Sequence, residues 1–239
     1  MTRAIPLVVF VAALCVAGAA ACRPARRGPT IARAWDVMGT VFTAAAWGPD
    51  SAALDHALER AAESIRVVDS LRASGRPVGA AVLHQARSVA RTAGVRFDAD
   101  SAAQGYALDR AALALAGVAD SALLDLGGPI LWIGTRPTRR RVGIADPENP
   151  LRTLAVVELT GGSALSTTVE SERRGTRSVT VLAPSSLAAD MWSTVLFSLG
   201  CDRALAVGAA GGVSVVCADS GRVRWTADLE GRVLPARGP

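Results

Sequence analysis

The spacing of apolar and polar positions predicts several helices along the chain. Apolar residues recur at helical spacing over Ser51–Leu71, and Asp50 stands directly before them, where it would cap the helix. Two further helices are predicted over Val78–Ala93 and Ser101–Ala116, because each apolar stripe is followed by a glycine. A fourth helix is predicted to follow Pro184-Ser185-Ser186 and to end at Gly200.

Strand patterns lie between and after these helices. They cover Ala34–Trp47, Asp120–Gly134 with a Gly127-Gly128 turn inside it, Arg141–Ile144, Arg152–Leu159, Ser178–Ala183, and a closing hairpin of Val213–Cys217 and Arg222–Ala227. Because helices and antiparallel-looking strands occur in mixed order, the pattern predicts an α+β domain. A chain of 239 residues, half of them apolar, can bury a full core in one such domain.

The charge of the chain does not indicate a nucleic-acid partner. All 26 basic side chains are arginines and the formal net charge is +5. However, the arginines are scattered, and the one dense run, Arg136 to Arg141, has no aromatic residues between its charges. We therefore expect no nucleic acid among the partners, and the lysine-free composition is typical of a GC-rich bacterial genome.

The N-terminus has the features of an export signal. Arg3 is followed by an apolar run from Ile5 to Gly18, which is short for a membrane span, and then by small residues and Cys22. This arrangement resembles a bacterial lipoprotein signal in which Cys22 becomes lipidated. Ala19 replaces the leucine usual in such signals, so plain cleavage near Ala21 is the alternative.

These features predict a signal peptide over residues 1–22, a tether over 23–31 and one domain over 32–239. The expected location is the extracytoplasmic (periplasmic) face of the bacterial inner membrane, with the membrane as a partner through the lipid anchor. After processing, Cys201 and Cys217 remain, and they could form a disulfide or stay as buried thiols. No CxxC motif accompanies them, and His56 and His84 are distant in sequence, so zinc is not expected.

The segment Ser178–Gly200 carries the clearest candidate chemistry. Asp190 and Thr194 are four residues apart on the predicted helix, so their oxygens would project from one face. A carboxylate and a hydroxyl are half of an oxygen site of the kind that Mg²⁺ prefers. The alternative is a solvated polar face, with Asp190 near the helix N-terminus for electrostatic reasons.

Six segments, in the same order along the chain, resemble the motifs of the ApbE-type FAD:protein FMN transferases. They are Met38-Gly39-Thr40, Asp98–Arg110 (DADSAAQGYALDR), Asp125–Gly134 (DLGGPILWIG), Arg141–Pro147 (RVGIADP), Ala164–Glu170 (ALSTTVE) and Ser178–Gly200. The resemblance spans residues 35–230. It implies an ApbE-like α+β fold, in which helices pack on a mixed antiparallel sheet similar to a T-fold.

The resemblance also implies an activity and a set of site residues. Enzymes of this family use FAD as substrate together with Mg²⁺, transfer FMN to a threonine or serine hydroxyl of an acceptor redox protein, and release AMP. By the motif matches, the cofactor-binding residues are Met38, Gly39, Thr40, Asp98, Gln104, Gly127, Gly128, Thr167, Thr168 and Glu170. The metal ligands are Ser101, Asp190 and Thr194.

The chain departs from the family pattern at three places. The family's H-I-I-D-P-x-T-G motif, whose histidine acts at the active site, has no counterpart in Ser171–Arg177. The loop with a flavin-stacking tyrosine is missing after Leu71, and the insert after Phe97 is very short. No catalytic residue is therefore assigned.

Loss of a general base removes only part of a rate enhancement, about 10²–10⁴-fold. The departures leave two alternatives to the transferase. One is a catalytically degenerate lipoprotein that binds FAD or another nucleotide, and the other is an FAD pyrophosphatase.

Overall fold

The computed structural model describes residues 30–75, 80–95, 102–134, 139–146, 149, 151–170, 177–219 and 222–236. The elements in chain order are β1 Thr30–Val37, β2 Thr40–Trp47, α1 Ser51–Ala73, α2 Ala80–Ala93, α3 Ala103–Leu113, β3 Ser121–Asp125, β4 Pro129–Gly134, β5 Arg140–Ala145, β6 Thr153–Leu159, β7 Ser163–Glu170, β8 Arg177–Ala183, α4 Ser186–Phe197, α5 Cys201–Ala210, β9 Ser214–Asp219, β10 Arg222–Trp225, η2 Ala227–Leu229 and β11 Val233–Pro235. None of the helices in these ranges is long and apolar enough to cross a membrane.

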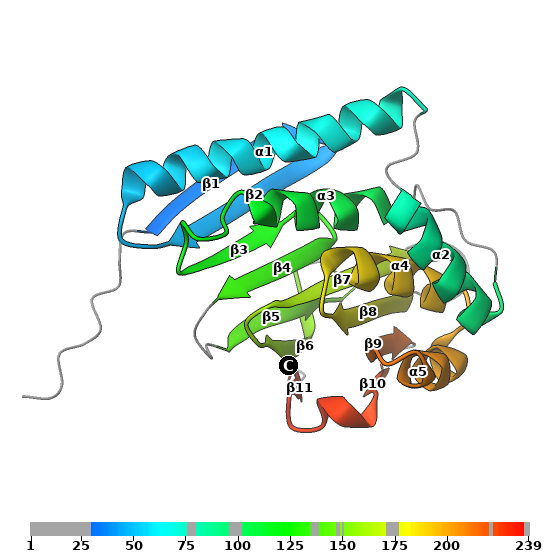
Figure 1. Cartoon of the computed structure of the whole chain (residues 1–239). Helices are drawn as coiled ribbons and strands as arrows, with labels where there is room; N and C mark the ends of the chain where they lie inside the picture. Colours follow the sequence, from blue (N-terminus) through cyan, green and yellow to red (C-terminus); the bar gives the residue numbers. More distant parts are fainter. Residues whose placement is uncertain are drawn as a thin grey trace, which may run out of the picture.

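One antiparallel sheet of eight strands forms the centre of the molecule (Figure 1). Its strand order is β1-β2-β3-β4-β7-β8-β9-β10, so that sequence neighbours are also spatial neighbours except where β4 pairs directly with β7. The two strands in between, β5 and β6, pair with β11 in a separate three-stranded sheet. The predicted α+β class is confirmed.

The two faces of the large sheet bury two separate cores. Helices cover one face, where apolar side chains of α1, α3 and α4 pack on those of β2, β3 and β8. The small sheet covers the other face, where Ile144, Val157 and Val233 pack against Trp132 and Leu165 of the large sheet. Residues that alternate along a strand point to opposite faces, so every central strand contributes to both cores.

The register of the first four strands defines two ends of the sheet. Thr30, Trp47, Ser121 and Gly134 lie side by side at one end, here called the proximal end because β1 begins there. At the opposite, distal end, Thr40 begins β2 and a turn joins Asp125 to Pro129. Thr40 and Trp47 are the two ends of β2, which separates the distal from the proximal end by about 24 Å at the usual rise per strand residue.

The structure corrects three predicted boundaries. The segment Ala34–Trp47 is a hairpin instead of one strand, because Met38 and Gly39 adopt positive φ angles of 52° and 72° and reverse the chain. The helix predicted to end at Gly200 ends at Phe197, and Gly200, with φ of 75°, directly precedes a further helix, α5. Strand β1 already starts at Thr30, inside the predicted tether.

A disulfide joins Cys201, the first residue of α5, to Cys217 in β9. Both cysteines are buried. Of the two alternatives, a disulfide or two buried thiols, the structure shows the disulfide. The bond links α5 to β9, the strand on which it packs.

Candidate functional site

Two of the predicted segments meet at the distal end of the sheet. The main-chain N–H of Met38 donates to Asp69 Oδ2 of α1 at 3.2 Å, which holds the β1–β2 turn against the helix. Gly127 has φ of 77°, and a Cβ atom at this position would lie 2.3 Å from Thr40 Oγ1. Only glycine allows the β3–β4 turn to approach the β1–β2 turn so closely.

The β1–β2 turn lines a shallow cavity of about 440 Å³, bounded by residues 36–41 and Asp69. Gly39 and Thr40 therefore line this cavity, and their role in binding the cofactor stays a prediction. Met38 is different, because its side chain is only 6% exposed and belongs to the helix-side core.

The β3–β4 turn carries a partly buried carboxylate. Asp125 Oδ1 accepts a hydrogen bond from the Gly127 N–H at 2.9 Å, which closes the turn. Burial raises the pKa of Asp125, and the Gly127 N–H opposes this shift only in part. The neighbouring Gly128 is open, because a Cβ atom placed there would have the Thr167 carbonyl oxygen, at 3.9 Å, as its nearest contact.

Asp190 lies at the interface of α3, α4 and β7 and is 7% exposed. Its Oδ2 accepts from the Gly105 N–H at 2.9 Å, and its Oδ1 accepts from the Ser166 hydroxyl at 3.1 Å. Burial raises the pKa of Asp190 to about 6, although both hydrogen bonds oppose the shift; the nearby Asp109 carboxylate raises it further. The interpretation of Asp190 as part of a solvated polar face is wrong.

Beyond Ser166, which bonds to the Asp190 carboxylate, other hydroxyl groups contact the main chain of Asp190 or one another. Thr194 Oγ1 donates to the Asp190 carbonyl oxygen at 3.0 Å, so both residues present oxygens on the same part of α4. Thr168 Oγ1 donates to Ser193 Oγ at 3.0 Å, and the Ser193 hydroxyl is 3.4 Å from that of Ser166. The polar cluster of α4 therefore continues onto β7.

The side chains of Thr167 and Thr168, both predicted to bind the cofactor, lie on opposite faces of the large sheet. Alternation along β7 directs Thr168 toward α4 and Thr167 toward the other face, where its hydroxyl lies 2.9 Å from that of Thr180. Only Thr168 therefore joins the Asp190 cluster.

Gly105 and Asp109 position α3 against α4, and neither was assigned a role from the sequence. A Cβ atom at Gly105 would lie 2.5 Å from the Ser186 carbonyl oxygen and 2.7 Å from Asp190 Cβ. The Asp109 carboxylate accepts from the N–H groups of Ser186 and Leu187 at 2.8 and 3.0 Å. Asp109 thus caps α4 from a neighbouring helix and satisfies two of its free N–H groups.

The oxygen donors present fit a hard divalent cation. No basic side chain of the described residues forms an ion pair with Asp190, while Asp109 adds a second negative charge nearby. The Thr194 hydroxyl uses its proton toward the Asp190 carbonyl and keeps its lone pairs. Within the described ranges, no three His, Cys, Asp or Glu side chains gather as a metal site. A cation here would therefore depend on few protein ligands, as Mg²⁺ commonly does.

Several predicted residues lie outside the described residues. These are Asp98, Ser101 and the lipidation residue Cys22, and the side chain of Glu170 is likewise not described. Gln104 is the second residue of α3, next to Gly105, and is half-buried. His56 and His84 are exposed on α1 and α2, and neither takes part in the hydrogen bonds around Asp190.

Solved structures of low sequence identity share this fold. The flavin transferase ApbE from Vibrio cholerae matches with a TM-score of 0.65 and 15% identity, covering 85% of this chain and 99% of that one. The flavinyl transferase ApbE from Pseudomonas stutzeri, in its apo form, matches at 0.62 and 17%, covering 86% and 98%. The ApbE protein from Thermotoga maritima matches at 0.68 and 14%, covering 85% and 99%.

A comparison of the sequence with protein families gives a more direct result. No curated protein matches the chain. Residues 27–174, in contrast, match the ApbE family, and this range contains the β1–β2 turn, the β3–β4 turn and the Ser166–Thr168 part of the site. The chain belongs to the ApbE family.

Proposed function

We propose that this protein transfers FMN from FAD to a threonine or serine hydroxyl of an exported redox protein and releases AMP, in a reaction that requires Mg²⁺. The observation that carries the proposal is the Asp190 cluster. It combines a buried carboxylate, which has no ion-pair partner among the described residues, with the hydroxyls of Thr194, Ser193 and Thr168. Family membership makes the flavin nucleotide the expected ligand.

The roles of the residues follow from their positions. The β1–β2 and β3–β4 turns would bind FAD along the distal end of the sheet, where Gly127 lets the two turns lie close together and Gly128 leaves room for a ligand to approach the backbone. Asp190 and Thr194, with Ser101 as a further oxygen donor, would hold Mg²⁺. When bound, Mg²⁺ would neutralise charge on the pyrophosphate during transfer.

The transfer itself is a substitution at phosphorus. The acceptor hydroxyl oxygen forms a new bond to the phosphorus of the FMN phosphate, and the bond from that phosphorus to the AMP oxygen breaks. The hydroxyl proton passes to solvent water or to the departing AMP phosphate, because neither His56 nor His84 is a partner of the Asp190 cluster. Positioning and charge neutralisation would therefore supply most of the rate.

The absent histidine motif supports a second candidate function. A protein that keeps the Asp190 cluster but has no histidine in Ser171–Arg177 fits a binding protein for FAD or another nucleotide as well as it fits a slow transferase. Hydrolysis of FAD to FMN and AMP is a third outcome, because water could replace the acceptor hydroxyl.

The test mixes the protein with FAD, Mg²⁺ and an acceptor domain that carries a flavinylation threonine, and it follows the acceptor by intact-mass spectrometry. We expect a mass increase by one FMN and release of AMP. The matched controls are the Asp190→Asn variant, which preserves size but removes the charge, and an acceptor with that threonine changed to alanine.

Three results separate the candidates. FMN on the acceptor that disappears with Asp190→Asn supports the transferase. Tight Mg²⁺-dependent FAD binding without transfer identifies the binding protein, and free FMN with AMP identifies the pyrophosphatase. FAD binding that is the same with and without Mg²⁺, in both wild type and Asp190→Asn, would contradict the metal assignment.

A further inference from the structure

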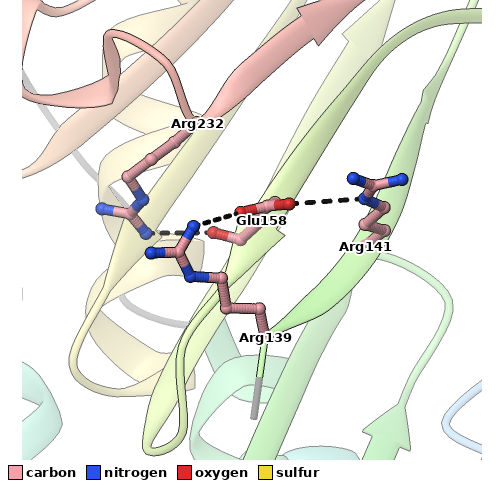
Figure 2. A network of polar contacts seen from close by, with 4 residues as sticks. All are labelled: Arg139, Arg141, Glu158 and Arg232. Carbon is pink, nitrogen blue, oxygen red and sulfur yellow. Dashed lines mark hydrogen bonds and ion pairs between the residues drawn. The ribbon is translucent and has the colours of Figure 1, made fainter. Parts of the chain in front are cut away.

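A cluster of arginines lies at the small sheet (Figure 2), outside the interface of α3, α4 and β7 that holds Asp190. The Arg139 and Arg141 guanidinium groups flank the Glu158 carboxylate at 3.0 and 3.3 Å, and Arg232 donates to the Glu158 carbonyl oxygen at 3.0 Å. The Glu158 carboxylate is thus paired with two guanidinium groups, and the third arginine is bound to the main chain of the same residue. The side chains of Arg139 and Arg141 are 70% and 68% exposed, so most of their surface remains available to a ligand.

The cluster is at the proximal end of the molecule. Arg140, between the two exposed arginines, places its guanidinium carbon 4.4 Å from the Trp47 ring and 4.6 Å from the Trp132 ring. Trp47 pairs in register with Thr30, the first described residue of β1. The chain segment that precedes the domain therefore joins it on the side where the arginines lie.

An exposed apolar residue lies beside the charges. Leu234 of β11 is exposed and pairs in register with Val156. Val156 and Glu158 are two positions apart on β6, so they share the outer face of the small sheet. A basic surface with an exposed leucine suits the boundary between lipid headgroups and acyl chains, where both kinds of group are stabilised.

The length and charge of the segment between Cys22 and Thr30 also favour a phospholipid membrane as the partner of this surface. Only seven residues separate Cys22 from Thr30, and the eight residue steps between the two span at most about 28 Å when fully extended. Three of these residues, Arg23, Arg26 and Arg27, are basic. If Cys22 carries the predicted lipid, the proximal end cannot move far from the bilayer, and its arginines meet phosphate groups at high effective concentration.

We infer that Arg139, Arg141 and Arg232, with Leu234, form a contact surface for anionic phospholipid headgroups. Arginine suits this role because its planar guanidinium donates two parallel hydrogen bonds to a phosphate. Contact through this surface would leave the opposite, helix-covered face of the large sheet, where α4 carries Asp190, directed away from the membrane. The inference depends on the proposed export and anchoring and makes no use of flavin transfer.

The test measures binding of the chain from Arg23 to Pro239 to phospholipid vesicles by flotation. This part of the chain is suitable because every residue of the two described cores lies between 37 and 233. One set of vesicles contains equal parts of phosphatidylglycerol and phosphatidylcholine, and the other contains phosphatidylcholine alone. We expect binding to the anionic vesicles only, weakening strongly between about 0.05 and about 0.5 M salt.

Matched variants locate the contact. Changing Arg139, Arg141 and Arg232 together to serine should weaken binding at least about tenfold, since each arginine near an anionic surface contributes about fivefold. The control changes Arg72, Arg87 and Arg91 to serine, which alters net charge equally at exposed positions of α1 and α2. It should shift binding less than about twofold.

Glu158→Gln gives a result of opposite sign. It removes the one carboxylate in the cluster and frees Arg139 and Arg141, so binding to anionic vesicles should become stronger by about fivefold. This variant and a triple change of the same arginines to lysine keep the test decisive if the serine variant does not fold. The lysine variant should retain binding.

Three outcomes would overturn the inference. They are equal binding to neutral vesicles, equal loss in the two serine variants, and binding to soluble heparin with no flotation on anionic vesicles. The last result would mean that the arginines bind a soluble polyanion.

Discussion

Gly105 brings α3 and α4 closer together than any other residue at this position would allow. Because Gly105 has no side chain, its N–H can reach Asp190 Oδ2 while the Ser186 carbonyl oxygen lies where a Cβ atom would otherwise be. The geometry of the Asp190 carboxylate therefore depends on a residue that has no functional group of its own.

We expect Gly105→Ala to lower the free energy of unfolding by about 1–3 kcal/mol, the usual cost of overpacking, because the new methyl group would push against main-chain atoms. Urea denaturation checks this. Gly128→Ala is the matched control, since its methyl group would enter open space, and its stability should stay within about 0.5 kcal/mol of wild type. Equal losses in both variants would contradict the close-approach argument.

The Asp125 carboxylate is partly buried, and its burial makes the charged form unfavourable. The folded-state pKa of Asp125 is raised above 3.8, so the contribution of this residue to stability is fully present below that pH and is lost as pH rises through the folded-state pKa. Asp125→Asn should remove this loss, because an amide oxygen can still accept from the Gly127 N–H.

Denaturant titrations of wild type and Asp125→Asn at acidic and neutral pH test the pH argument. The variant should gain stability relative to wild type as pH rises. A difference between the two proteins that stays constant with pH would show that the Asp125 charge is not the cause.

At the scale of elements, α4 is held by contacts from segments distant in the chain. Its N-terminus receives the Asp109 carboxylate from α3 in addition to its own cap, in which Ser185 accepts from the Ala188 N–H at 3.2 Å. Because α4 carries both Asp190 and Thr194, the orientation of the candidate metal ligands is fixed partly by α3.

Asp109→Ala should reduce stability by about 1–3 kcal/mol, since it leaves two main-chain N–H groups of α4 without acceptors in a partly buried place. Asp50→Ala is a good comparison. Asp50 also accepts from two N–H groups, at the start of α1, but it is exposed to water that can replace it. Thermal unfolding should show the larger loss for Asp109→Ala, and the reverse order would refute the role assigned to Asp109.

The disulfide between α5 and β9 closes a short loop, with a sequence separation of 16 residues. Its removal is expected to cost about 3 kcal/mol, mainly by giving the unfolded chain more freedom. Unfolding of the Cys201→Ser, Cys217→Ser double variant checks the value. Wild type treated with a phosphine reductant should show a similar loss once the bond is reduced, and no change in a fully reduced sample would exclude a stabilising role.

At the scale of the whole molecule, one sheet separates two cores, and neither core can persist without it. Trp192 belongs to the helix-side core and Trp132 to the core under the small sheet. Because the central strands contribute side chains to both, we expect the two cores to unfold in one cooperative transition.

Fluorescence of the Trp192→Phe and Trp132→Phe variants tests this cooperativity. Within each variant, the denaturation midpoint from the remaining tryptophans should coincide with the midpoint from far-ultraviolet circular dichroism. Separate midpoints would mean that the small sheet and its core unfold on their own.

Local features of the fold could be read from the sequence because their signals are local. The apolar stripe of α1 with its Asp50 cap and the Gly127-Gly128 turn were predicted and are present. Met38 and Gly39 were wrongly predicted to lie inside a continuous strand, because no pattern in a sequence signals a positive φ angle at a methionine. The proximity of Asp190 and Thr194 on one helix was predicted from their spacing and is present, while their role as metal ligands stays a prediction.

The rest of the site depends on contacts between distant segments. Ser166, Ser193 and Asp109 gained their roles only when β7, α3 and α4 came together, over separations of up to 78 residues. The burial of Asp190 has the same origin. Residue patterns report which face is apolar, but they do not report which partner will cover it.

The direct pairing of β4 with β7 has a consequence for how such a protein can change over evolution. Residues between Gly134 and Ser163 leave the large sheet and return to it without altering its register, so they behave as an insertion in an otherwise continuous meander. This insertion contains Arg139, Arg141 and Glu158, whereas the Asp190 cluster is built entirely outside it. The surface of the inserted hairpin can therefore be replaced, lengthened or recharged in descendants while the polar cluster on α4 stays intact.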